Sequence, residues 1–99
     1  MILEIAILNV TNGKEKEFEK AFGEAQKIIM SIPGYVNHNL KRSSDYPSRY
    51  LLMVKWNKLE DHQIGFRKSE QYQVWKKMLH HFYNPVPKVE YYDDENIYP

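Results

Sequence analysis

The sequence predicts an α+β fold in which helices cover one face of an antiparallel sheet, in the order β-α-β-β-α-β. Two segments, 18–32 and 59–82, carry apolar residues at helical spacing, and four others carry strand signals. Turn and break signals separate these segments. This order of elements is the ferredoxin-like arrangement. The length of 99 residues fits one domain, 1–99.

The first two elements are a strand over 2–10 and a helix that follows an Asn12-Gly13 turn. The strand is almost continuously apolar, which is typical of a strand buried on both faces. The helix is predicted from apolar residues at helical spacing, with charged residues between them: Phe18, Ala21, Phe22, Ala25, Ile28, Ile29 and Ile32. Pro33 and Gly34 should end it, because the residue before a proline disfavours helical geometry.

Two strands are predicted next, at 35–41 and 50–56, joined by a polar loop at 43–48. In the first, alternation places Tyr35, Asn37, Asn39 and Lys41 on one face and Val36, His38 and Leu40 on the other. In the second, Tyr50, Leu52, Val54 and Trp56 share a face.

The segment 56–82 is rich in aromatic residues and predicts two short helices. Leu59, His62 and Phe66 share one face, and a longer stripe follows at Tyr72, Trp75, Leu79 and Phe82. Gly65 indicates a bend, and Ser69 a new helix start. The prolines in 84–87 break the chain, 88–93 is the last predicted strand, and 94–99 is a tail.

Composition excludes several classes of protein. The net charge of +1, from 14 basic and 13 acidic residues, gives no electrostatic reason to expect nucleic acid or a membrane as a partner. Without cysteine there is no disulfide, thiolate metal site or cysteine nucleophile. The apolar start is short, contains Glu4 and lacks a basic leader, so we expect a soluble cytoplasmic protein.

The first strand also predicts a homodimer. If water covered one face of the sheet, residues 2–10 should alternate between apolar and polar, yet both faces are apolar. At about 25 cal/mol per Å² of apolar area, leaving one such face in water would forfeit several kcal/mol. A second subunit packed against this face is the simplest way to bury it.

Several segments together resemble the antibiotic biosynthesis monooxygenase (ABM) family. They are EIAILNV, GKEKEFEKAF, PGYVNHNLKR, YLLMVKWNKLEDHQIGFRKSEQYQVW and FYNPVPKVEYY, and they span almost the whole chain. The resemblance implies a dimeric α+β barrel, in which two sheets pack face to face. It also implies, for some members, oxygenation of anthrones or quinols by molecular oxygen with no metal or organic cofactor. Other members degrade haem or isomerise small molecules, so the fold does not fix the reaction.

His62 is the leading candidate for a catalytic group, because an imidazole titrates near neutral pH and this one faces inward in the block that matches the family. The alternative is a structural histidine that bonds a backbone carbonyl. The candidate substrate-binding residues form an aromatic pocket or, alternatively, simply fill the core: Trp56, Phe66, Tyr72, Trp75, Phe82 and the mid-strand His38.

The remaining polar residues are weaker candidates. His80 and His81 are adjacent and cannot both face one site, so no metal site is expected there. Arg49 and Arg67 are expected as solvated surface charges. Asn37 and Asn39 are poor strand residues, which points weakly to an interface or ligand.

Haem degradation is disfavoured by three departures from the pattern of that branch. Residues 72–76 contain no histidine, Ala6 stands near the expected asparagine, and 65–66 lacks the expected tryptophan. Two function classes remain. One is a cofactor-independent monooxygenase of a small aromatic or quinol-like molecule, and the other is a non-catalytic dimeric binding or stress-related protein. An open cavity near His62 would favour the first, and a filled one the second.

Overall fold

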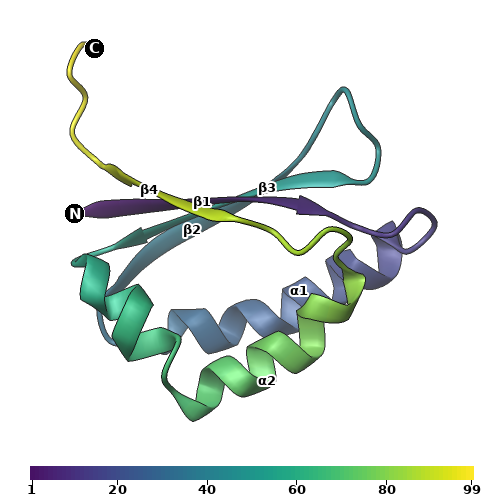
Figure 1. The fold of residues 1–99 in the computed structure, drawn as a ribbon, viewed down its shortest axis with the longest axis horizontal. Helices are drawn as coiled ribbons and strands as arrows, with labels where there is room; N and C mark the ends of the chain where they lie inside the picture. The colour runs from purple at the N-terminus through teal and green to yellow at the C-terminus, as the bar shows by residue number, and fades with distance from the viewer.

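The computed structural model describes residues 1–99 and has the predicted order of elements. The strands are β1 (Ile2–Asn9), β2 (Tyr35–Arg42), β3 (Arg49–Trp56) and β4 (Val89–Asp93). The helices are α1 (Glu15–Met30) and α2 (Glu70–Leu79), with a short π-helix η1 (Asp61–Phe66) and a 3-10 turn η2 (His80–Phe82). All helices lie on one face of the sheet (Figure 1). The predicted ferredoxin-like α+β fold is confirmed.

The sheet is antiparallel throughout, with the order β2-β3-β1-β4. In this register Glu4 of β1 lies between Val54 of β3 and Tyr91 of β4. Directly opposite residues share a face, so all three side chains point toward the helices. The register therefore brings an acid and a tyrosine, distant in sequence, side by side.

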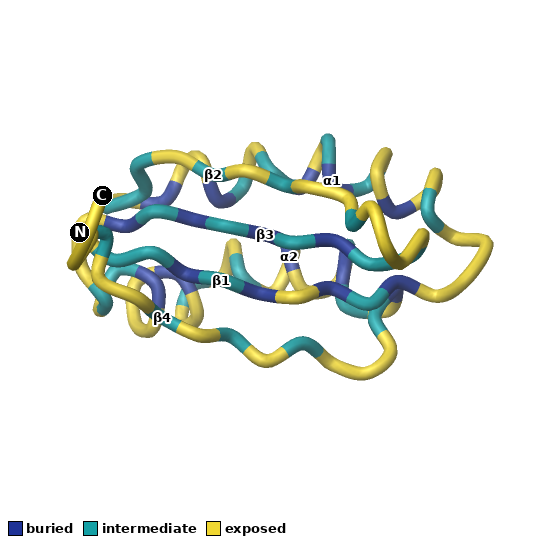
Figure 2. The backbone as a smooth tube through the Cα atoms, turned by 90° about the horizontal axis from the view of Figure 1, so that it is seen from above, coloured by how far each residue is buried: buried dark blue, intermediate teal, exposed yellow.

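Alternation along β3 is complete, and its inward residues are all buried: Tyr50, Leu52, Val54 and Trp56. The same pattern of buried and part-exposed residues runs along β1 (Figure 2). The outward side chains of these two central strands are mostly apolar and half-buried or exposed. The apolar ones are Leu3, Ile5, Ile7, Leu51 and Met53. The chain by itself thus leaves one face of its sheet uncovered.

The start of β2 departs from the predicted alternation. A register irregularity between Tyr35 and Asn37 places Tyr35 opposite Trp56, and its ring meets Trp56 edge-on at 6.2 Å. Tyr35 also bonds His38 through its hydroxyl, so it lies on the helix-covered face and not with Asn37 as predicted. The reason is the bulge, because one extra residue reverses the side of every residue before it.

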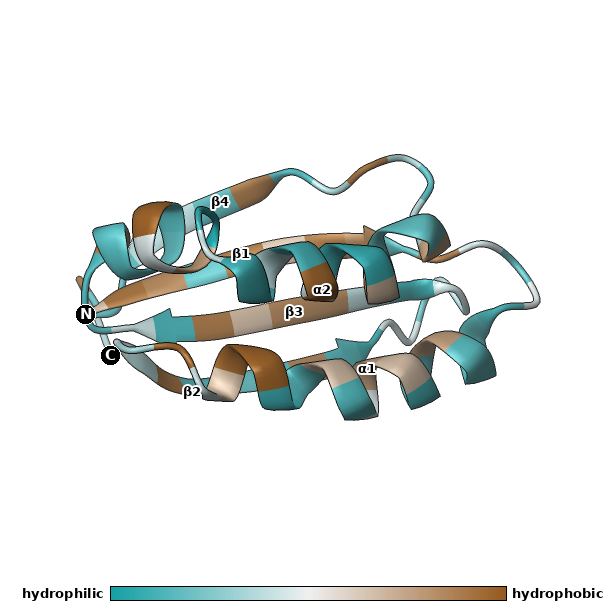
Figure 3. Ribbon diagram, turned by 90° about the horizontal axis from the view of Figure 1, so that it is seen from below, coloured by the Kyte–Doolittle hydropathy of each residue, from teal (hydrophilic) through white to brown (hydrophobic).

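The helix boundaries follow the predicted signals closely. Gly13 and Gly34 have φ values of 88° and 93°, as expected for the two turn glycines. The Ser69 hydroxyl caps α2 by accepting from the Tyr72 N–H at 3.1 Å. Figure 3 shows α1 along the β2 side of the sheet and α2 along the β1 side, with η1 close to β4.

The first short helix is a π-helix, which the sequence did not reveal. It is anchored at its start, where the Asp61 carboxylate accepts from the Lys58 N–H at 3.0 Å. A Cβ at Gly34 would lie 2.2 Å from the Asp61 carboxylate, so glycine there lets η1 pack against the turn between α1 and β2. π-helical segments are frequent at functional sites. In this one, His62 and Phe66 are the buried residues, which are the two predicted to face inward.

Candidate active site

A cavity of about 540 Å³ lies between the sheet and the η1–α2 segment. Its apolar floor includes Leu8 of β1 together with Leu52 and Val54 of β3. Typical small-molecule sites occupy roughly 300–1,000 Å³ and have mostly apolar linings with a few polar groups. The cavity is therefore large enough for a small aromatic molecule, and His62 lies on its lining.

The aromatic wall of this cavity comes from the predicted stripe. Phe66, Tyr72 and Trp75 all line it. The Phe66 ring meets Tyr72 edge-on at 5.2 Å and Trp75 edge-on at 5.7 Å. These T-shaped contacts hold the rings in fixed orientations, which gives a flat ligand a defined surface.

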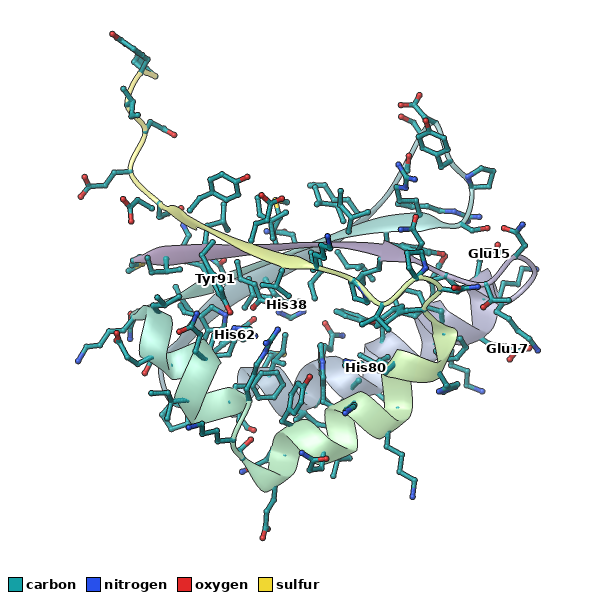
Figure 4. The ribbon with its side chains drawn as sticks, viewed as in Figure 1. Glu15, Glu17, His38, His62, His80 and Tyr91 are labelled. Carbon is teal, nitrogen blue, oxygen red and sulfur yellow. The ribbon has the colours of Figure 1, made fainter.

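A buried polar network closes one end of the cavity. Glu4 is only 5% exposed, and its Oε1 accepts from the indole N–H of Trp56 at 2.9 Å. Its Oε2 lies 3.4 Å from Nε2 of His62, which is itself only 3% exposed. The other ring nitrogen, Nδ1, lies 2.6 Å from the hydroxyl of Tyr91. Figure 4 shows His62 and Tyr91 facing each other between η1 and β4.

The protein environment raises the pKa of Glu4 and lowers that of His62. Burial raises the pKa of Glu4 to about 7, although the Trp56 hydrogen bond and the charge of Arg67 oppose the rise. Burial, assisted by the same arginine, lowers the pKa of His62 to about 4. At neutral pH the imidazole is therefore uncharged, while Glu4 divides between acid and carboxylate. Burial also raises the pKa of Tyr91, so its hydroxyl keeps its proton.

Three nitrogen-bearing side chains line the same cavity and were not predicted to belong to it. They are Arg67, just after η1, Lys76 of α2 and His80 of η2. His80 lies on the inner side of the α2 end (Figure 4). Burial, Lys76 and Arg67 together lower its pKa, so both cations are close enough to act on it.

The remaining predicted site residues lie outside this cavity. Trp56 is fully buried behind it and stacks against Phe66 at 6.0 Å. Phe82 packs edge-on against Phe18 in the core, at 5.7 Å. His38 lies in a separate hollow of about 500 Å³ between α1 and β2, where its Nε2 is 2.8 Å from the Gln26 side-chain oxygen.

Sequence reasoning missed Glu4 and Tyr91 as members of the site. The signal for Glu4 was present, because it is the one charged residue in an apolar strand and shares its face with Ala6 and Leu8. An acidic side chain at a strand position that faces the core is rare unless it has a polar or charged partner. Nothing local marked Tyr91, because its place depends on how β4 pairs with β1.

The structure contains no group of three or more histidine, aspartate or glutamate side chains placed to hold a metal ion. None of its helices has the length and apolar character needed to cross a lipid bilayer.

The sheet, the one-sided helices and the aromatic cavity with a buried acid–histidine pair define a small α+β protein with a candidate site for a small molecule. The antibiotic biosynthesis monooxygenase family model matches residues 1–78, and the chain belongs to this family. It is 47% identical over 94 residues to YczJ, an uncharacterised protein of Bacillus subtilis, covering 95% of this chain and 99% of YczJ.

Solved structures agree with the family assignment. A Bordetella bronchiseptica protein that carries the family's name is 32% identical, with a TM-score of 0.91 over 96% of this chain and 97% of its own. SnoaB of Streptomyces nogalater, a cofactor-independent oxygenase, has a TM-score of 0.84 over 99% of this chain and 96% of its own. At 17% identity, the likeness to SnoaB shows the fold alone.

Proposed function

We propose that this protein is a monooxygenase that oxidises a small aromatic or quinol-like substrate with molecular oxygen, without a metal or organic cofactor. The observation that carries the proposal is the open cavity of about 540 Å³ with Glu4 and His62 on its lining. Family membership and the described activity of SnoaB support the same reaction class.

The chemistry needs a proton acceptor in an apolar site. A phenol or anthrone that loses a proton becomes an electron-rich anion, which reacts with oxygen to give a hydroperoxide on carbon. Loss of water from that hydroperoxide leaves a carbonyl group. For an anthrone methylene, one atom of molecular oxygen becomes the carbonyl oxygen, and the other leaves as water with the two methylene hydrogens. The substrate therefore supplies every electron, and the protein's task is to take the first proton, hold the anion and exclude water.

The Glu4–His62 pair is the proposed proton acceptor. A carboxylate with a pKa of about 7 is a much stronger base than an ordinary glutamate, and a catalytic pKa near the working pH is the most effective. Burial makes Glu4 the stronger base of the pair, since it raises the pKa of Glu4 to about 7 and lowers that of His62 to about 4. Glu4 therefore receives the proton, and His62, 3.4 Å away, orients it. The sequence-based role of His62 as the base itself stays a prediction within the same pair.

The aromatic wall is the proposed binding surface. Phe66, Tyr72 and Trp75 present rings to the cavity, and a flat substrate can stack on them. Trp56 supports the site from behind by holding Glu4 through its indole N–H. We propose no substrate contact for Phe82 or His38, because neither lines this cavity.

Oxygen uptake with a panel of quinols and anthrones tests the function. Protein treated with chelator should consume oxygen with at least one of them, and Glu4→Gln should lose that activity. Glu24→Gln is the matched control, because Glu24 is an exposed acid of α1 that pairs only with Lys27. A panel that contains compounds shown to bind in the cavity, yet gives no uptake, would contradict the proposal.

The second candidate is a non-catalytic binding protein with the same fold. The saturation of the polar network favours it, because Glu4, His62 and Tyr91 are all satisfied by one another and by Trp56. Such a network stabilises a fold without any reaction. Tight binding of aromatic ligands with no oxygen uptake would identify this function.

We further propose that two copies pair through the open face of the sheet. Outward Ile5 and Met53 are register partners at its centre, and Ile7 is 47% exposed in the single chain. The 43–48 loop and the C-terminal tail rise above this face (Figure 1). Sedimentation should show a dimer that Ile5→Glu dissociates and that Lys16→Glu, on the exposed side of α1, leaves intact. A stable monomer of the unaltered protein would contradict this pairing.

A further inference from the structure

We propose that the substrate is an aromatic molecule with an anionic oxygen substituent, such as a carboxylate, bound by Arg67, Lys76 and His80 at the rim of the cavity. Its hydroxylated ring would then lie over Glu4 and His62. This inference rests on the proposed function, because it names the substrate class of the same cavity. Three features of the lining carry it.

The first feature is unpaired positive charge. Arg67 and Lys76 line the cavity, and neither takes part in any ion pair or side-chain hydrogen bond of the chain. Other exposed lysines, such as Lys68 and Lys77, also make no ion pair, so what distinguishes Arg67 and Lys76 is their position on the cavity lining. A planar guanidinium and a mobile ammonium are the groups that proteins use to bind carboxylates.

The second feature is a surplus of hydrogen-bond donors. Tyr72, Trp75 and Tyr83 line the cavity, and the two hydroxyls and the indole N–H of these residues bond no protein group. None of these atoms is sealed from solvent, because every buried side-chain nitrogen or oxygen has a partner. By contrast, the only carboxylate on the lining is Glu4, whose oxygens already face Trp56 and His62. A ligand rich in acceptor oxygens matches this lining.

The third feature is the order of groups along the cavity. Tyr72, Lys76 and His80 follow at intervals of four residues, so they lie in line on one side of α2 and its extension. From Tyr72 to His80 the helix rises roughly 12 Å. The Tyr72 ring meets His80 edge-on at 6.0 Å, and His80 lies 5.7 Å from Tyr83. The cavity therefore has an acid–base end at Glu4 and a second end at Lys76 and His80, with Arg67 between them, because its charge acts on Glu4, His62 and His80 alike.

These two ends impose an orientation on the ligand. An anion is repelled by the Glu4 carboxylate and attracted by Arg67 and Lys76, so the acidic substituent belongs at the rim. The ring and its hydroxyl then extend past Phe66 and Trp75 toward Glu4. A neutral quinol of equal size lacks this anchor and should bind more weakly in no fixed direction.

A matched pair of ligands tests the inference. The probes are 6-hydroxy-2-naphthoate and its methyl ester, which share the ring and the hydroxyl and differ in charge. In both, the hydroxyl lies at the end of the ring system opposite the carboxyl group. Titration calorimetry should show that the acid binds about ten-fold or more tightly than the ester, as expected for charge-assisted hydrogen bonds. This preference should shrink at high salt, because screening weakens exposed charge pairs.

Two double variants test whether Arg67 and Lys76 cause the preference for the acid over the ester. The double variant Arg67→Gln with Lys76→Met should bind acid and ester equally. The matched control is Lys68→Gln with Lys77→Met, which alters the adjacent exposed residues that do not line the cavity. Equal affinity for the two ligands in the unaltered protein, or a preference that survives in the cavity double variant, would overturn the inference.

The test separates this inference from the proposed function, because it measures binding without turnover. A carboxylate preference without oxygen uptake from any quinol would refute only the oxygenase. Oxygen uptake from quinols in a protein that shows no preference for the acid would refute only the anionic substrate.

Discussion

The two halves of the helix-covered face each place a histidine between a tyrosine hydroxyl and an oxygen acceptor, but the acceptors differ. Under α1, His38 lies between Tyr35 and the neutral amide of Gln26. Under η1, His62 lies between Tyr91 and the buried carboxylate of Glu4. Burial lowers the pKa of both histidines. Only the second half contains an acid whose proton affinity is shifted to the neutral range.

The spaces beside the two histidines also differ. The α1 half also has a hollow, of about 500 Å³, but its lining is mainly polar and includes Glu19, Gln26 and Arg42. Beside it, the ring of Phe18 contacts Phe22 at 6.0 Å and Tyr50 at 4.8 Å. In the η1–α2 half, the rings of Phe66 and Trp75 border an open cavity. Similar residue types thus build a mainly polar hollow beside an aromatic cluster in one half and a mainly apolar cavity in the other. The comparison teaches that a shifted acid, together with an apolar cavity, distinguishes a candidate site from a satisfied histidine beside a polar hollow.

The largest expected effect contrasts packing in the two halves. Phe18→Ala should lower the free energy of unfolding by about 3–5 kcal/mol, because Phe18 is fully buried and its removal leaves a void. Tyr72→Ala should cost clearly less, because Tyr72 already borders an open cavity. Urea unfolding of both variants measures the difference. Equal losses would contradict the description of the second half as open.

A second effect follows from the shifted acid. Glu4 has a folded-state pKa of about 7 against a reference value of 4.5, so protonation favours the folded state. Its contribution to stability is fully present below pH 4.5 and is lost as the pH rises to about 7. Glu4→Gln has no carboxyl group to ionise at this position, so it does not lose stability in this way. Relative to the unaltered protein it should therefore gain up to about 3 kcal/mol between these pH values.

Urea unfolding across the pH range measures this gain. The matched control is Glu24→Gln, whose carboxylate is exposed on α1 and should give a difference that does not change with pH. A constant difference for Glu4→Gln as well would show that the burial of Glu4 does not shift its pKa.

The smallest effect contrasts the starts of the two helices. The Ser69 hydroxyl caps α2, whereas Lys14 at the start of α1 makes no side-chain cap. Ser69→Ala should lower the free energy of unfolding by about 1 kcal/mol. Lys14→Ala removes only an exposed ion pair with Glu17 and should change it by less than about 0.5 kcal/mol. A Ser69→Ala loss no larger than that of Lys14→Ala would contradict the role of the cap.

Most of the fold was predictable, because local signals determine it. The apolar spacing in α1, the glycine turns and the alternation in β3 each act over a few residues, and the structure agrees with all three. The bulge at Tyr35 and the π-helical form of η1 were not predictable from the sequence. Both depend on how distant segments pack, as the contact of Gly34 with Asp61 shows.

The site was predictable only in part, for the same reason. The spacing of His62, Phe66, Tyr72 and Trp75 placed them on one inner face, and the structure brings all four to the cavity. Glu4 and Tyr91 join them only through the pairing of β1 with β4. In the sequence, Arg67 and Lys76 resemble ordinary charged surface residues. Only the structure shows that they line the cavity.

The most direct test of the account is the pH dependence of oxygen uptake in the unaltered protein and in Glu4→Gln. The account predicts that kcat/KM rises with pH and levels off above an apparent pKa near 7, which belongs to the Glu4–His62 pair. In Glu4→Gln the rate should fall by roughly 10²–10⁴-fold and this rise should disappear. His38→Gln should keep both the rate and the profile. A Glu4→Gln protein with the rate and profile of the unaltered protein would contradict the account.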